Sequence, residues 1–173
     1  MRAMLLSHLA SLADEPEPLS LVELEKPEPG PGEILVAVST CGVCHTELDE
    51  IEGRTPPPAL PIVPGHQVVG RVVAAGAGAA RFTDGDRVGI GWIHASDGTQ
   101  NENLSPQFVA TRRDVNGGYA EYITVPDQYA DPMPPAFPDV EAAPLLCAGG
   151  VGYPSLVLAG HEERAPLGQT GFG

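Results

Sequence analysis

Apolar and polar positions alternate in short runs along most of this chain, and turn residues separate the runs. Residues 119–125 alternate between apolar and polar side chains over most of their length, which is typical of a strand. Residues 33–39 are apolar on both faces and therefore predict a buried strand, and residues 67–74 form the clearest predicted strand. Additional strands are predicted over 1–9, over 19–26, and from the turn at 85–88 to near Trp92.

Helical signals are short and lie mainly in the last part of the chain. A helical turn is predicted around 46–52, Asp139 is expected to cap a helix interrupted by Pro144, and another helix is predicted over about 153–159. Two segments lack periodicity: 54–64, with five prolines, is predicted to be an extended loop, and 94–116 a long loop or small lobe. Short strands followed by helix indicate a β-barrel or sandwich that leads into another domain.

Composition narrows the functional classes. The 173 residues suffice for one domain with a core and a short extension, and the 21 glycines and 19 prolines fall mostly between apolar runs, as turns do. A net charge of −14 argues against a nucleic-acid partner, and no apolar run approaches the length of a membrane span. The apolar N-terminus soon reaches Asp14-Glu15, so we interpret it as a first strand and expect a cytoplasmic protein.

Four residues supply candidate metal chemistry: Cys41, Cys44, His66 and Cys147. Catalytic zinc sites use three protein ligands and keep a fourth position open, and Cys44, His66 and Cys147 would give that count. Other interpretations remain open on spacing alone. Cys41 and Cys44 could form a structural half-site or a redox pair, His66 could be a turn residue, and Cys147 a buried thiol.

Longer motifs resemble a known family. The matching stretches are Cys-Gly-Val-Cys-His-Thr-Glu-Leu at 41–48, Pro-Gly-His at 64–66, Val-Gly-Arg-Val-Val at 69–73, Phe-Thr-Asp-Gly-Asp-Arg-Val-Gly at 82–89, Gly-Gly-Tyr-Ala-Glu-Tyr at 117–122 and Ala-Ala-Pro-Leu-Leu-Cys-Ala-Gly at 142–149. In this order they closely resemble the N-terminal, GroES-like catalytic domain of zinc-dependent medium-chain alcohol dehydrogenases. The resemblance implies a mainly β, partly open GroES-like barrel with a few short helices.

The resemblance also implies a domain division. Residues 1–150 correspond to the GroES-like catalytic domain, and 151–173 to a linker helix and the incomplete start of an NAD(P)-binding Rossmann domain. Gly171-Phe172-Gly173 resembles the opening of the glycine loop of that domain. We therefore expect a C-terminal helix leading to an absent Rossmann domain, and no productive binding of a nicotinamide cofactor by this chain alone.

Site residues follow from the resemblance position by position. Cys44, His66 and Cys147 fall at the positions of the three zinc ligands. The implied reaction is reversible hydride transfer between a small alcohol or aldehyde and NAD(P), for which zinc lowers the pKa of the alcohol.

Four further positions carry implied roles. Thr46 matches the hydroxyl that hydrogen-bonds the zinc-bound alkoxide, and His45 a contact to the cofactor pyrophosphate. Asp49 stands where many relatives have the histidine that ends the proton relay. Trp92 stands where a bulky residue limits the alcohol pocket, which favours smaller primary alcohols; it could equally be a core aromatic.

Besides Asp49, the chain departs from the family pattern in three further places. Ser105 stands where a cysteine of the structural zinc site would lie, so one catalytic zinc and no structural zinc are expected. Gln67 replaces a glutamate after the ligand histidine. Glu47 replaces a shorter aspartate beside that histidine, which is expected to alter its orientation.

Two other functions stay open: a non-catalytic zinc-binding GroES-like module, and a relic without metal or activity. A domain of this kind is expected to expose the apolar face that packs on a Rossmann domain, and to self-associate through it.

Overall fold

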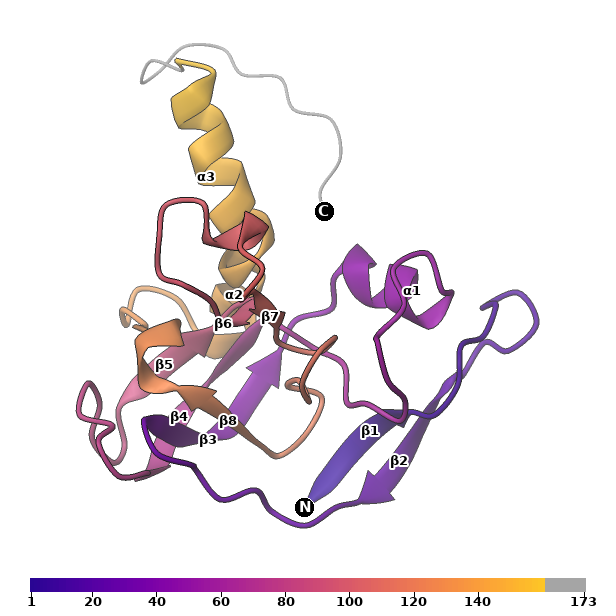
Figure 1. Ribbon diagram of the computed structural model, residues 1–173, viewed down its shortest axis with the longest axis horizontal. Coiled ribbons are helices and arrows are strands. Elements are labelled where there is room, and N and C mark those ends of the chain that lie inside the picture. The colour runs from indigo at the N-terminus through magenta and orange to yellow at the C-terminus, as the bar shows by residue number, and fades with distance from the viewer. Residues whose placement is uncertain (161–173) are drawn as a thin grey trace.

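The computed structural model describes residues 1–160, and its centre is a curled antiparallel sheet (Figure 1). The strand order is β8-β3-β4-β5-β9. These strands are β3 (Glu33–Cys41), β4 (Val68–Ala75), β5 (Arg87–Ile90), β8 (Tyr122–Pro126) and β9 (Ala130–Pro132). The predicted mainly β, partly open barrel is confirmed.

The curl of the sheet comes from its longest strand pair. The register between β3 and β4 shifts between Leu35 and Val36 and again between Val38 and Thr40. Such bulges bend a strand and increase its twist, so the sheet closes around its inner side chains. Ten buried residues form this core: Ile34, Val36, Val68, Val72, Phe82, Val88, Ile90, Ile123, Val125 and Ala130.

Two small sheets flank the barrel. One pairs β1 (Arg2–Leu6) with β2 (Leu19–Glu23), and the other pairs β6 (Ile93–Ala95) with β7 (Val109–Ala110). A second apolar cluster contains Leu6, Ile51 and Ile62, and so anchors α1 (His45–Ile51) against the first of these sheets.

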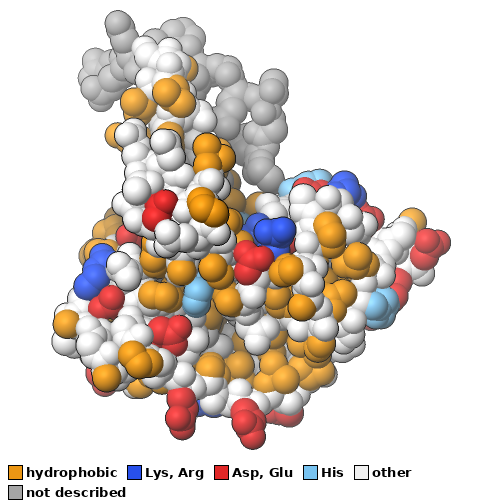
Figure 2. Space-filling view, viewed as in Figure 1, with side chains coloured by type: hydrophobic (Ala, Val, Ile, Leu, Met, Phe, Trp, Pro, Cys, Tyr) orange, Lys and Arg blue, Asp and Glu red, His pale blue; other side chains and the backbone are white. Residues whose placement is uncertain are grey.

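The remaining helices follow the barrel. They are α2 (Asp139–Ala142), α3 (Ala148–Leu158) and the 3₁₀ turns η1 (Glu102–Leu104), η2 (Asp127–Tyr129) and η3 (Ala143–Leu146). The helix α3 projects away from the sheet, carries apolar side chains on its surface and buries none of its residues (Figures 1 and 2). Self-association through such a face remains a prediction.

No single helix within residues 1–160 has both the length and the apolar character that crossing a membrane requires. The bent pair formed by 139–146 and 148–158 meets these two requirements when its halves are counted together.

Two strands of the central sheet differ from the sequence prediction. The strand expected from 119 begins at Tyr122, because Gly117, Gly118 and Tyr119 donate their backbone N–H groups to residues 63–65 instead. The strand β9 was missed because its Asp-Pro sequence is typical of a turn, although proline is tolerated on the edge of a sheet.

The helix signals also differ in detail. Asp139 is the first residue of α2 and follows the N-cap Pro138, and its carboxylate accepts from Arg87 Nε at 2.8 Å. The helix expected at 153 starts at Ala148, before the predicted boundary at residue 150, and continues through Pro154. The predicted glycine-loop fragment Gly171-Phe172-Gly173 lies outside the described residues.

Candidate metal centre

Three segments far apart in sequence bring two thiols and one imidazole together. Cys44 is the N-cap of α1, His66 precedes β4, and Cys147 is the N-cap of α3. Their ligand atoms all lie within 4.8 Å of one another, and the two Sγ atoms are 3.9 Å apart. Within residues 1–160, this is the one group of three or more such side chains close enough to hold a metal ion.

Glu47 links two of these three residues. Its Oε2 accepts from the backbone N–H of Cys44 at 2.9 Å, which closes a capping box at the start of α1. Its Oε1 contacts Nδ1 of His66, and both side chains are almost completely buried. Because Glu47 occupies Nδ1, the imidazole presents Nε2 as its free nitrogen.

Close backbone packing positions the histidine loop. Gly117 donates to the carbonyl of Val63 at 2.6 Å, and Tyr119 donates to the carbonyl of Pro64 at 2.9 Å. A Cβ on Gly117 would lie far inside contact distance of the Gly65 carbonyl oxygen, so only glycine permits this approach.

The donor set and its geometry fit zinc. A tetrahedral zinc with Zn–S bonds of about 2.3 Å places two sulfurs about 3.8 Å apart, close to the observed separation. Burial and the adjacent Cys44 thiol raise the pKa of Cys147 to about 11, so two neighbouring thiolates need a compensating cation. A divalent ion held by the three ligand atoms would supply that charge.

Cys41 differs from Cys44 although only two residues separate them. Its Sγ donates to the carbonyl of Gly42 at 3.6 Å and packs against the barrel core. Burial raises the pKa of the Cys41 thiol to about 12, which favours the protonated form. Cys41 therefore has the surroundings of a structural thiol, an interpretation raised from the sequence for Cys147 and not for Cys41.

Of the other sequence-predicted residues, Thr46 lies beside the ligand cluster, whereas His45 and Asp49 pair with each other on α1. Thr46 Oγ1 lies 3.5 Å from Cys44 Sγ and so belongs to the ligand cluster. His45 Nε2 lies 3.6 Å from Asp49 Oδ1, and that oxygen accepts from Arg54 Nε at 2.5 Å. The partners of Asp49 are thus exposed side chains from the start of α1 and from the turn that follows it.

Trp92 lines a cavity of about 500 Å³ whose walls include Leu145 and Leu146 but none of the three ligand residues. Its Nε1 donates to Asn103 Oδ1 at 2.7 Å. Trp92 therefore lies at a cavity wall beside the segment that carries Cys147, and it also anchors the lobe that contains η1.

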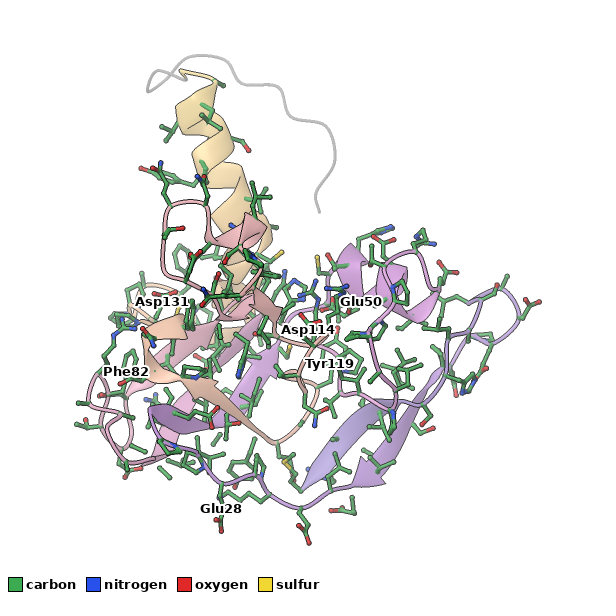
Figure 3. The ribbon with its side chains drawn as sticks, in the orientation of Figure 1. Glu28, Glu50, Phe82, Asp114, Tyr119 and Asp131 are labelled. Atoms are coloured by element: carbon green, nitrogen blue, oxygen red, sulfur yellow. The ribbon has the colours of Figure 1, made fainter. Side chains whose placement is uncertain are left out.

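Sequence reasoning missed two buried charged residues behind the metal centre. Glu50 and Arg112 are 2 % and 8 % exposed, and Arg112 Nε lies 3.1 Å from Glu50 Oε1. Figure 3 shows Glu50 on α1 near Asp114 and Tyr119, where α1 meets the segment after β7. An arginine pair before a polar turn is typical of a solvated surface, so no sequence signal marked Arg112.

The buried Glu50 carboxyl predicts a pH-dependent stability. Burial raises its pKa to about 7, and the attraction of Arg112 only partly opposes this. The stability that Glu50 contributes is therefore complete below the ordinary carboxyl pKa and is lost as pH rises to about 7. We expect the free energy of unfolding to fall by roughly 1–3 kcal/mol relative to Glu50→Gln between about pH 4.5 and 7. Urea unfolding across this range measures the difference, and parallel profiles for the two proteins would contradict it.

Comparison with known proteins identifies relatives of this chain. Residues 30–135 match the alcohol dehydrogenase GroES-like domain family. The "probable alcohol dehydrogenase AdhA" of Mycobacterium tuberculosis is 45% identical over 167 residues, which covers 90% of this chain and 48% of the relative. An alcohol dehydrogenase of Geobacillus stearothermophilus is 41% identical over 162 residues, with the same two coverages.

Solved structures share the fold. A cinnamyl alcohol dehydrogenase from Sorghum bicolor superposes with a TM-score of 0.79 at 28% identity, covering 92% of this chain and 48% of that one. An NAD-dependent alcohol dehydrogenase superposes with a TM-score of 0.81, also at 28% identity, covering 92% and 47%. The chain thus spans about half the length of the relatives that it matches.

Proposed function

The chain belongs to the alcohol dehydrogenase GroES-like domain family, and on that premise we propose that it forms the zinc-binding catalytic half of an alcohol dehydrogenase. The observation that carries the proposal is the convergence of Cys44, His66 and Cys147 within 4.8 Å. We infer reversible hydride transfer between a small alcohol or aldehyde and NAD(P). When bound, zinc would act as a Lewis acid on the substrate oxygen, and the nicotinamide would exchange the hydride.

The residues of this chain have distinct proposed roles. Cys44, His66 and Cys147 hold the metal, and the contact of Glu47 with Nδ1 turns the imidazole of His66 toward it. Thr46, beside Cys44, is the hydroxyl group available to exchange a proton with the substrate. Exposed His45, at the start of α1, is proposed to contact the cofactor pyrophosphate.

Two further roles are proposed for residues outside the ligand cluster. Asp49 could pass a proton from His45 to solvent, but its carboxylate is also held by Arg54. Trp92 would limit substrate size from the wall of its cavity, beside the segment that carries Cys147.

Zinc analysis combined with an activity assay tests this function. Because the chain matches about half of the Geobacillus enzyme, it is assayed alone and as a chimera in which it replaces the matching half of that enzyme. We expect about one zinc per chain. We also expect the chimera to reduce NAD⁺ or NADP⁺ in an alcohol-dependent way that chelation abolishes and zinc restores. Zinc without reduction would favour the non-catalytic module, and the absence of both would favour the metal-free relic.

A further inference from the structure

Arg112 adopts a left-handed backbone conformation, which is unfavourable for an arginine. Its φ is 81°, and among residues 1–160 no other non-glycine residue has a positive φ. The left-handed region brings Cβ against the backbone of any residue except glycine, so glycine would form this turn with less strain. A non-glycine residue held in this strained conformation points to a role for its side chain.

The side chain reaches the back of the metal centre. Arg112 Nε lies 3.1 Å from Glu50 Oε1 and 3.8 Å from Glu47 Oε1. Glu47 in turn contacts Nδ1 of His66 and accepts from the backbone of Cys44. Arg112 thus stands one side chain behind two of the three proposed ligands.

The arrangement places one positive side chain beside two buried carboxylates. Glu47 and Glu50 are each 2 % exposed, and two carboxylates in such a site repel each other. In the part of the chain that the structure describes, Arg112 is the arginine or lysine that forms ion pairs with them. Its guanidinium is therefore the positive charge that faces both carboxylates and holds Glu47, which contacts His66, in place.

We propose that Arg112 is a positioning residue for the metal centre, holding Glu47 in the orientation that fixes His66 and the start of α1 for zinc. The inference rests on the proposed zinc site and adds a residue behind the ligands. Substituting Arg112 is expected to weaken zinc binding even where it relieves the backbone strain.

Three variants at Arg112 distinguish the effect of its side-chain charge from the effect of its backbone strain. Arg112→Gly removes the strain and the charge, Arg112→Met removes the charge alone, and Arg112→Lys restores a cation. The control is Arg113→Met, which removes the same charge one residue away, where the side chain is 42% exposed and pairs with Asp114. Zinc affinity is measured by competition with a chromophoric chelator, ligand geometry by the absorption spectrum of the cobalt(II)-substituted protein, and folding by thermal unfolding.

We expect Arg112→Gly and Arg112→Met to bind zinc about 10- to 100-fold more weakly, the usual effect of losing a residue that orients a ligand. Their cobalt spectra should change, Arg112→Lys should recover part of the affinity, and Arg113→Met should match the parent. Parent-like affinity and spectrum in Arg112→Gly and Arg112→Met would overturn the inference even if their stability changed. A parent that binds no zinc would overturn both this inference and the proposed function, so the two failures are distinguishable.

Discussion

Cys44→Ser is expected to remove zinc from the protein, while Cys41→Ser leaves it in place. Cys44 Sγ lies 3.9 Å from Cys147 Sγ and belongs to the cluster that also contains His66. Serine lacks the thiolate that zinc prefers, so the site loses one of three ligands and one of two compensating charges. The effect should exceed the 10- to 100-fold cost of losing an orienting residue, and we expect a loss of affinity on the order of 10³-fold or more.

Elemental analysis of protein purified without added metal measures this effect directly. The parent and Cys41→Ser should each carry about one zinc per chain, and Cys44→Ser very little. Cys41 is a matched control because it lies three positions before Cys44, at the end of β3, and its partly buried side chain packs against the core. If Cys41→Ser lost its zinc as well, Cys41 and Cys44 would have to act together as a structural half-site. If the parent protein itself carried no zinc, Cys44, His66 and Cys147 would not form a working metal site, and the metal-free relic would be favoured.

Gly70→Ala is expected to be the most destabilising single-methyl change in the central sheet. Gly70 lies in β4 opposite Val38 of β3, beside the second register shift of that pair. An added Cβ would lie 2.6 Å from Val36 Cγ1 and even closer to the carbonyl oxygen of Ala37. Because a backbone group cannot move aside as a flexible side chain can, the strands must separate locally. We expect the free energy of unfolding to fall by about 2–3 kcal/mol.

The chain offers a matched control for this substitution. Gly152 lies in α3 and has no other atoms within 4 Å of an added Cβ. Because glycine is unfavourable inside a helix, Gly152→Ala should be neutral or stabilising by up to about 1 kcal/mol. Urea unfolding of the two variants measures the contrast. Equal stabilities would mean that β3 and β4 can separate at the bulge without cost.

The chain's local patterns predicted most of its strands and the types of its ligands. The apolar runs near 33–39 and 67–74 became β3 and β4, because side-chain alternation reflects a strand's own geometry and burial. The helical turn predicted around 46–52 is α1, and the structure shows that Glu47 closes its first turn with a capping box to the backbone of Cys44. The resemblance to a dehydrogenase family also rested on such local stretches.

Contacts between distant segments could only be established in three dimensions. Cys44 and Cys147 are 103 residues apart, and their approach depends on the strand register and on how α3 leaves the barrel. The pairing of the edge strand β9 and the burial of Arg112 also depend on contacts with distant segments. The polar sequence around Arg112 predicts exposure instead. Arg112 is buried because its turn directs the side chain toward Glu47 and Glu50 on α1. Local periodicity carries no information about such pairings, which follow from the packing of the whole chain.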